Sequence, residues 1–417
     1  MRVAAALPAR GHVLNVCTDR YRFTVGLAAS LVAKKVSLLP STQAAEAIRQ
    51  LTAFAPDVFC LTDDARCDID LPRMQFPEAP VEEHPPWRCP EIDTRQIAAY
   101  LFTSGSTGTP QPYPKSWGRL AACVREGAGR LGLLDGRCHS IVGTVPSQHM
   151  YGLELTVLVP LQTGNVCCAE RPFYPADICQ VLAAVPRPRT LVSTPVHLRM
   201  LLAADVDLPA ADLIVSATAP LSQNLAREVE ARFDTRLIEI YGSTETGQIA
   251  SRRTAHTAEW QLWDGVRLFS KDDRTWADGG HIEQPTPMCD VLEVTGGDRF
   301  LLHGRMADLV NIAGKRSSLA YLNHHLNAVP GVVDGAFFLR DDVQELTAGV
   351  TRVAAVVVAP GLDPATLVER LRERIDPIFL PRPLVFVDKL PRNETGKLPH
   401  EALQALVAHS MKRLAPK

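Results

Sequence analysis

Short apolar runs alternate with longer amphipathic stretches through the first half of the chain. Runs such as Val58–Thr62 are continuously apolar, which is typical of strands buried on both faces of a sheet. Stretches such as Trp117–Leu131 have the apolar spacing that one face of a helix requires. The alternation predicts parallel or mixed sheets that are flanked by helices.

The individual elements follow from the same pattern. Strands are expected at 36–40, 58–62, 97–102, 140–145, 190–194, 212–216 and 236–240. Helices are expected at 23–36, 42–54, 117–131, 196–203 and 221–233, and a further helix is expected to end near residue 161.

The pattern changes near residue 250. From there to 303, short strand-like runs alternate with Gly/Asp turns, which predicts a small antiparallel element. From 304 onward, helical and strand-like runs indicate a separate α+β domain. The expected fold is therefore α/β, with a large N-terminal domain at 1–303 and a small C-terminal domain at 304–417.

Composition narrows the class of protein. A length of 417 residues with 46% hydrophobic and 22% charged residues is ordinary for a soluble globular protein with two or three domains. A net charge of −2 without long runs of one sign argues against binding to nucleic acid. No apolar run approaches the roughly 20 residues of a membrane-spanning helix, so no membrane insertion is expected.

The cysteines and the N-terminus indicate the compartment. Ten cysteines occur without a C-x-x-C pair, and their spacing does not match a zinc site. The apolar stretch at the N-terminus is too short for the core of a signal peptide. Reduced thiols and a cytoplasmic location are therefore expected.

The first candidate site is a loop rich in glycine and hydroxyl groups at 103–108, Thr-Ser-Gly-Ser-Thr-Gly. It follows the apolar run 97–102, and prolines at 110, 112 and 114 exclude a regular helix after it. Glycines let the backbone approach phosphate oxygens, hydroxyl and N–H groups donate to them, and Lys115 supplies charge. The loop indicates a polyphosphate site, with an ordinary Ser/Gly turn as the alternative.

A Walker-type phosphate loop is excluded by the surroundings of the lysine. Such a loop needs Gly-Lys-Ser/Thr at its end and a helix directly after it. Here Pro114 precedes Lys115, so no helix begins around the lysine.

The second candidate site is the run Tyr-Gly-Ser-Thr-Glu-Thr-Gly at 241–247, which follows an expected strand. Tyr241 offers an aromatic face for a flat ring, the hydroxyls suit a phosphate, and Glu245 offers a carboxylate for Mg²⁺. The alternative is a helix N-terminus that Ser243 or Thr244 caps, with Glu245 in the first turn.

Together, the T-S-G-S-T-G-x-P and Y-G-x-T-E patterns resemble the adenylate-forming superfamily: acyl-CoA synthetases, peptide-synthetase adenylation domains and beetle luciferases. The resemblance implies ATP and Mg²⁺, with Glu245 as metal ligand and catalytic residue. Gln111 stands where many members carry lysine, and Lys115 is the expected substitute. The residues that the resemblance assigns to ATP are Thr103, Ser104, Gly105, Ser106, Thr107, Gly108, Lys115, Ala219, Tyr241, Gly242, Thr244, Asp290 and Arg305.

Further matches extend the resemblance along the chain. His149, in a P-x-x-H-x-x-G setting, is implied to line the acyl pocket near the reacting carboxylate. The run 216–221 resembles the S-G-G-A-P-L turn beside the adenine, although Ala217 and Thr218 replace two glycines. A carboxylate suits the ribose because it can accept from both hydroxyls of a diol. Asp290 is the favoured ribose ligand because of its spacing from the G-R-x-x-D match. Asp298 is the competing candidate, and a plain turn aspartate remains the alternative for both.

The last two matches concern the C-terminal part. Gly304-Arg305-x-x-Asp308 resembles the family's G-R-x-x-D hinge, which implies a mobile C-terminal domain that pivots at 306–308. The run 391–397 resembles P-x-x-x-x-G-K, whose lysine bridges the substrate carboxylate and the α-phosphate. Lys397 is therefore the expected catalytic lysine, because a cation between two anions offsets their repulsion in the transition state.

The expected function is ATP-dependent activation of a carboxylic acid as an acyl-adenylate, followed by thioester formation. The runs 15–23, 110–115 and 310–316 resemble a compact bacterial subgroup of aryl-polyene and xanthomonadin pigment clusters. That resemblance implies a hydroxybenzoate-type acid and an acyl carrier protein as thiol acceptor, with coenzyme A as the alternative. Two other classes stay open: a non-catalytic nucleotide-binding module, and an ATPase or kinase that releases phosphate or ADP.

Overall fold

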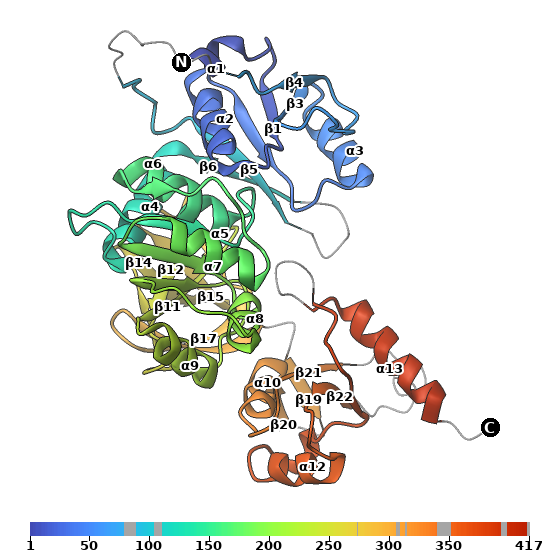
Figure 1. Ribbon diagram of the computed structural model, residues 1–417. Coiled ribbons are helices and arrows are strands. Elements are labelled where there is room, and N and C mark those ends of the chain that lie inside the picture. The colour runs from blue at the N-terminus through green and yellow to red at the C-terminus, as the bar shows by residue number, and fades with distance from the viewer. Residues whose placement is uncertain are drawn as a thin grey trace.

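The computed structural model describes residues 1–78, 89–103, 111–272, 274–305, 309–312, 315–339, 352–392 and 398–414. In Figure 1 a six-stranded sheet forms the upper part, a nine-stranded sheet lies in the middle, and the C-terminal elements lie below it. The expected residues Ser104 to Gly108, the hinge at 306–308 and Lys397 lie outside the described residues, as do the side chains of Thr103 and Arg305.

The first sheet has the order β4-β3-β1-β2-β5-β6. Its neighbours are parallel except β6, which returns antiparallel to β5 at the sheet edge. Its strands are β1 (His12–Asn15), β2 (Val36–Leu39), β3 (Val58–Thr62), β4 (Arg73–Gln75), β5 (Ile97–Thr103) and β6 (Gln111–Ser116). Its helices are α1 (Arg2–Ala6), α2 (Arg20–Val32) and α3 (Ala45–Phe54).

The second sheet has the order β17-β18-β13-β12-β11-β10-β9-β7-β8. Its parallel half is β7 (Ser140–Gly143), β8 (Val166–Cys167), β9 (Arg189–Ser193), β10 (Leu213–Ser216) and β11 (Leu237–Ser243). Its antiparallel half is β12 (Gly247–Arg252), β13 (Trp260–Leu262), β17 (Asp290–Gly296) and β18 (Arg299–Arg305).

Helices between the strands cover these sheets. They are α4 (Trp117–Leu131), α5 (Met150–Gly152), the π-helical segment η1 (Leu153–Leu158), α6 (Val159–Thr163), α7 (Pro175–Ala184), α8 (Pro195–Ala203) and α9 (Gln223–Phe233). The segment η1 contacts α4 and α2, and one continuous hydrophobic core includes residues of both sheets. No helix in the described ranges combines the length and the apolar character needed to cross a bilayer.

The remaining elements form smaller sheets. A three-stranded sheet contains β14 (Val266–Lys271), β15 (Arg274–Gly279) and β16 (Thr286–Pro287). The C-terminal part contains β19 (Leu309–Ile312), β20 (Lys315–Ser318), α10 (Leu319–Asn327), β21 (Asp334–Leu339), β22 (Val353–Val358), α12 (Pro364–Arg372), η3 (Pro377–Phe379), β23 (Leu384–Phe386) and α13 (His400–Leu414). It has its own hydrophobic clusters on both faces of the sheet β21-β22-β23.

The expected elements are largely confirmed, with several bounds shifted by a few residues and two differences that matter for the fold. The strands expected between 250 and 303 are not one small element, because β13, β17 and β18 extend the nine-stranded sheet and β14–β16 stand apart. The helix expected to begin at 23 begins at Arg20, because the Asp19 side chain accepts from the N–H of Arg22 and caps it. The predicted domain boundary at 303/304 falls near the end of β18, and the domain ranges stay predictions.

A buried arginine joins the two sheets. Arg20 is 1% exposed and makes five hydrogen bonds to groups that follow β7 and β8 or lie at their ends. Two of these, 3.0 Å each, go to the carbonyls of Gly143 and Val145. Because the guanidinium satisfies several carbonyls at once, α2 fixes the start of the segment that leads to His149.

Arg20→Lys should lower the free energy of unfolding by about 3 kcal/mol, because lysine keeps the charge but leaves buried carbonyls without a donor. Urea denaturation measures this change. Arg49→Lys on the exposed face of α3 is the matched control, with an expected change below about 0.5 kcal/mol. Equal effects of the two substitutions would contradict the structural role of Arg20.

Candidate functional site

The expected polyphosphate loop falls in the chain between β5 and β6, and its residues 104–108 lie outside the described residues. β5 and β6 are antiparallel, and Thr103 and Gln111 are register partners on either side of residues 104–110. The prolines at 112 and 114 fit β6 because an edge strand has one side without ladder hydrogen bonds. The expectation that no helix follows the loop is confirmed.

Lys115 lies inside the protein. It is 5% exposed, and its Nζ donates to the backbone carbonyl of Glu245 at 2.8 Å. Burial lowers the pKa of Lys115, and the nearby carboxylate of Glu154 is the first of the groups that oppose this change. The contact joins two segments that the sequence assigned separately to the nucleotide.

Glu245 lies in a tight turn between β11 and β12, which we call the Glu245 turn (residues 243–247). The alternative of a helix N-terminus at this place is wrong, because a second strand follows directly. Ser243 and Thr246 bond to each other through both hydroxyls and both backbone N–H groups, at 3.1 and 3.2 Å. Gly247 has φ +73°, and a Cβ on Gly242 would lie 2.2 Å from the carbonyl oxygen of Gly247. The turn therefore depends on both glycines.

Tyr241 connects this turn to the antiparallel half of the sheet. Its hydroxyl donates to Asp290 Oδ2 at 2.6 Å, and its ring packs against Trp260 and Phe300. Asp290 and Arg305 are register partners on β17 and β18. The structure thus brings together Tyr241, Asp290 and the backbone of Arg305.

Asp298 has different surroundings. It is exposed in the turn between β17 and β18, and it accepts from Gln261 Nε2 at 2.9 Å. That hydrogen bond is the main cause of a lowered pKa of Asp298. Asp290 is therefore the aspartate that lies beside the Tyr-Gly-Ser-Thr-Glu run, and its role at a ribose stays a prediction.

His149 directly precedes α5 and is half-buried, and its carbonyl accepts from the N–H of Leu153 at 2.7 Å. Tyr151, on the following helix, donates to the carbonyls of Ser193 and Val215 at 3.1 and 3.0 Å. The histidine is thereby carried by a helix that is anchored to the ends of β9 and β10.

The turn after β10 contains Ala219, which is half-buried. Thr218, in this turn, has φ +77°, a left-handed conformation that glycine adopts freely and β-branched residues rarely do. Threonine therefore occupies a glycine-like backbone position, and strain of this kind is concentrated at functional sites.

Lys115 belongs to a group of buried polar side chains beneath the Glu245 turn, of which sequence reasoning missed the other four. We call this group the buried cluster: Lys115, Cys123, Glu154, Gln248 and His281. All five are at most 6% exposed. Glu154 was the available signal, because it is the one charged residue in the apolar run 153–159. Burying a carboxylate there costs free energy unless neighbouring groups bond to it or it has a function.

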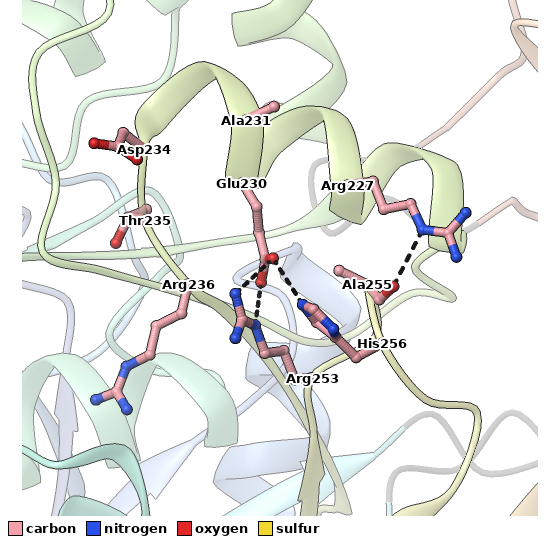
Figure 2. Close-up of a pocket in the computed structure, with 9 residues that line it drawn as sticks. All are labelled: Arg227, Glu230, Ala231, Asp234, Thr235, Arg236, Arg253, Ala255 and His256. Carbon is pink, nitrogen blue, oxygen red and sulfur yellow. Dashed lines mark hydrogen bonds and ion pairs between the residues drawn. The ribbon is translucent and has the colours of Figure 1, made fainter.

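Figure 2 shows a separate surface hollow of about 720 Å³ beside α9. Two of its arginines already have partners, since Arg253 contacts Glu230 at 2.9 and 3.0 Å and Arg227 donates to the carbonyl of Ala255 at 3.2 Å. None of the residues predicted for the site lines it.

The donor set for Mg²⁺ is small. Within the described ranges, no group of three or more His, Cys, Asp or Glu side chains could hold a metal ion. Magnesium at nucleotide sites commonly uses one or two carboxylates together with phosphate oxygens and water, so the single half-buried Glu245 fits such a site.

The chain matches two family models. Residues 5–294 match the model of the AMP-binding enzyme, and residues 326–397 match the AMP-binding enzyme C-terminal domain. A 4-coumarate–CoA ligase from Rhodobacter capsulatus is 32% identical over 303 residues, which are 72% of this chain and 74% of the relative. An indoleacetate–CoA ligase from Aromatoleum aromaticum is 26% identical over 362 residues, with 77% and 69% covered.

Solved structures share the fold. ATP-bound MatB from Rhodopseudomonas palustris has a TM-score of 0.80 at 19% identity, covering 97% of this chain and 91% of that one. The o-succinylbenzoate CoA synthetase MenE from Bacillus subtilis, in complex with its acyl-adenylate intermediate, has a TM-score of 0.78 at 17% identity, with the same coverage. The expected α/β fold, with a large N-terminal and a smaller C-terminal domain, is confirmed.

Asp290→Asn should weaken AMP binding by roughly 10- to 100-fold if Asp290 has its predicted role, because an amide would lose the charge-assisted hydrogen bonds that a carboxylate makes to the ribose hydroxyls. Isothermal titration calorimetry measures the dissociation constant. Asp298→Asn is the matched control and should change it less than about twofold. The reverse order would assign the ribose to Asp298.

Proposed function

The chain belongs to the AMP-binding enzyme family, the adenylate-forming superfamily, and on this premise we propose that it joins an aryl acid to a thiol through an aryl-adenylate. Its class is that of an AMP-forming acid–thiol ligase, as the sequence led us to expect. A non-catalytic nucleotide-binding module, an ATPase and a kinase are set aside.

The first half-reaction forms a mixed anhydride. A carboxylate oxygen of the acid attacks the α-phosphorus of ATP, the bond to the bridging oxygen breaks, and pyrophosphate leaves. Two anions must approach each other in this step, so a cation between them lowers the barrier. We assign that cation to Lys397, which is the last residue of the C-terminal family match.

The N-terminal residues hold the nucleotide. The loop 103–108 would surround the phosphates, Ala219 and the Tyr241 ring would contact the adenine, and Asp290 would accept from the ribose hydroxyls with Arg305 assisting. The backbone at Gly242 and the hydroxyl of Thr244 complete the set beside the phosphate. Glu245 would hold Mg²⁺, which supplies positive charge to the phosphate oxygens when it is bound.

The second half-reaction forms the thioester. A thiolate sulfur attacks the acyl carbon of the adenylate, AMP leaves, and the carboxyl carbon ends bonded to sulfur. His149 would lie near this carbon. We propose the phosphopantetheine of an acyl carrier protein as acceptor, with the C-terminal domain turning about 306–308 between the steps. Coenzyme A presents the same thiol, and the relatives named CoA ligases favour it as the alternative.

The acid is proposed to be aromatic. The resemblance to the pigment-cluster subgroup suggests a hydroxybenzoate-type acid, and the two relatives above are named for 4-coumarate and indoleacetate. These names support an aromatic ring without choosing among aryl acids.

One contact carries the proposal most directly. Tyr241 donates to Asp290 at 2.6 Å, and the turn that follows Tyr241 is bonded to Lys115 of β6 through the carbonyl of Glu245. The residues that we assign to the base, the ribose and the metal ion are thus linked by this hydrogen bond or by neighbouring positions in the chain.

ATP–pyrophosphate exchange over a panel of aromatic and aliphatic acids tests the function. Exchange should depend on the acid and be fastest with an aryl acid, with AMP as the nucleotide product. Lys397→Ala should reduce it by at least about 100-fold while thioester formation from synthetic aryl-AMP is kept, because the lysine acts in the first step only. Lack of exchange with every acid would refute the activity, and equal loss in both assays would refute the role of Lys397.

A further inference from the structure

The buried cluster holds the Glu245 turn at its middle residue and at the residue that directly follows it. On one side, Lys115 Nζ donates to the carbonyl of Glu245 at 2.8 Å. On the other side, the N–H of Gln248 donates to Glu154 Oε1 at 3.4 Å, and the thiol of Cys123 donates to the same oxygen at 3.1 Å. A Cβ on Gly247 would lie 3.0 Å from Glu154 Oε1, so the carboxylate sits directly beneath the turn.

The cluster and the turn also border a common space. Lys115, Cys123 and His281 line one small cavity with Thr246 and Gly247 of the turn. The cluster and the turn are therefore neighbours on both sides of this space.

Lys115 and Glu154 are groups of opposite charge type, and each affects the pKa of the other. Burial raises the pKa of Glu154 and lowers the pKa of Lys115, because water no longer stabilises either charge. Glu154 leads the groups that favour the charged lysine, followed by Cys123, Glu283 and Glu245. Burial and Lys115 lower the pKa of His281 to about 4, so the imidazole is neutral at pH 7.

The backbone that carries Glu154 is unusual. Glu154 lies in the π-helical segment η1, which begins directly after α5 and four residues after His149. Single π-helical turns within helices are rare and occur frequently at functional sites. Glu154, which contacts the residue after the Glu245 turn, and α5, which His149 precedes, therefore belong to one continuous helical stretch.

We propose that Lys115 and Glu154 are positioning residues, which act together to fix the Glu245 turn so that the Glu245 carboxylate meets the metal ion on the nucleotide. The proposal rests on the function proposed above and refines the sequence expectation, because it gives the Lys115 ammonium to a backbone carbonyl rather than to a phosphate.

A purely structural role makes different predictions. Replacing one partner of a buried charged set destabilises a protein through the uncompensated charge, whatever its place in the fold. A positioning role adds a specific effect on the metal. The two are separated by measuring ATP affinity with and without Mg²⁺, beside thermal stability.

The variants are Lys115→Met, which keeps the stem and removes the ammonium, and Glu154→Gln, which keeps the shape and removes the charge. Calorimetric titration of ATP over a range of Mg²⁺ concentrations is the assay. Both variants should raise the Mg²⁺ concentration for half-maximal tightening by roughly 10-fold and change Mg²⁺-free ATP affinity less than about twofold. In ATP–pyrophosphate exchange, kcat should fall while KM for the acid stays within about twofold.

Glu230→Gln is the matched control. Glu230 is another largely buried carboxylate, which Figure 2 shows beside Arg253. It accepts from the N–H of Leu237, at the opposite end of β11 from the turn. This variant should lose stability and keep the wild-type Mg²⁺ dependence.

Three outcomes would contradict the positioning role of Lys115 and Glu154. Loss of thermal stability in both variants without a change in Mg²⁺ dependence would leave a structural role only. Weaker Mg²⁺-free ATP binding in Lys115→Met alone would make the lysine a phosphate ligand. An equal change of Mg²⁺ dependence in Glu230→Gln would make the effect non-specific. If the wild type binds MgATP but catalyses no exchange, the proposed function fails. The titration still tests whether Lys115 and Glu154 position the Glu245 turn.

Discussion

The hydrogen bond from the Lys115 ammonium to the carbonyl of Glu245 is the contact on which the site depends. It ties β6, at the edge of the first sheet, to the turn between β11 and β12 in the second sheet. Burying an ammonium group costs free energy unless the group is hydrogen-bonded and a negative charge lies nearby. The contact therefore depends on the carboxylates around Lys115. The carboxylate of Glu154 supplies the leading part of that negative charge.

Around this contact, the fold gathers segments that lie far apart in the chain. Arg20 fixes the stretch before His149 from the first sheet, and Tyr241 reaches across the second sheet to Asp290. β11 is the point where the nine-stranded sheet changes from parallel to antiparallel, and the Glu245 turn is at its end. Ligands of α/β sheets commonly bind at the carboxyl ends of the strands, where the topology of the sheet changes. The Glu245 turn lies at such a place.

Much of this arrangement could be predicted from the sequence. The strand at Val58–Thr62 and the helix at Trp117–Leu131 have the bounds that apolar spacing indicated, because burial imposes its period on the sequence. The loop 103–108 and the Tyr-Gly-Ser-Thr-Glu run were singled out because glycines and hydroxyls mark them, and the polyphosphate role of the loop stays a prediction. The family and the class of enzyme followed from their order.

Other features could not be predicted because they depend on contacts across the fold. Nothing in the order of residues shows that Lys115 meets the carbonyl of Glu245, 130 positions further along the chain. The start of β12 directly after the turn was hidden because Ser243 and Thr244 also suit a helix N-terminus. The π-helical segment that contains Glu154 lies within an apolar run. Apolar spacing alone does not distinguish a π-helical turn from a regular α-helical one.

Hydrogen–deuterium exchange with and without AMP tests most directly whether these segments meet at one nucleotide. The account predicts that AMP slows amide exchange together in the Glu245 turn, at Asp290 and in the turn that contains Ala219. Slower exchange confined to one of these segments, or found instead beside α9 in the hollow of Figure 2, would contradict it.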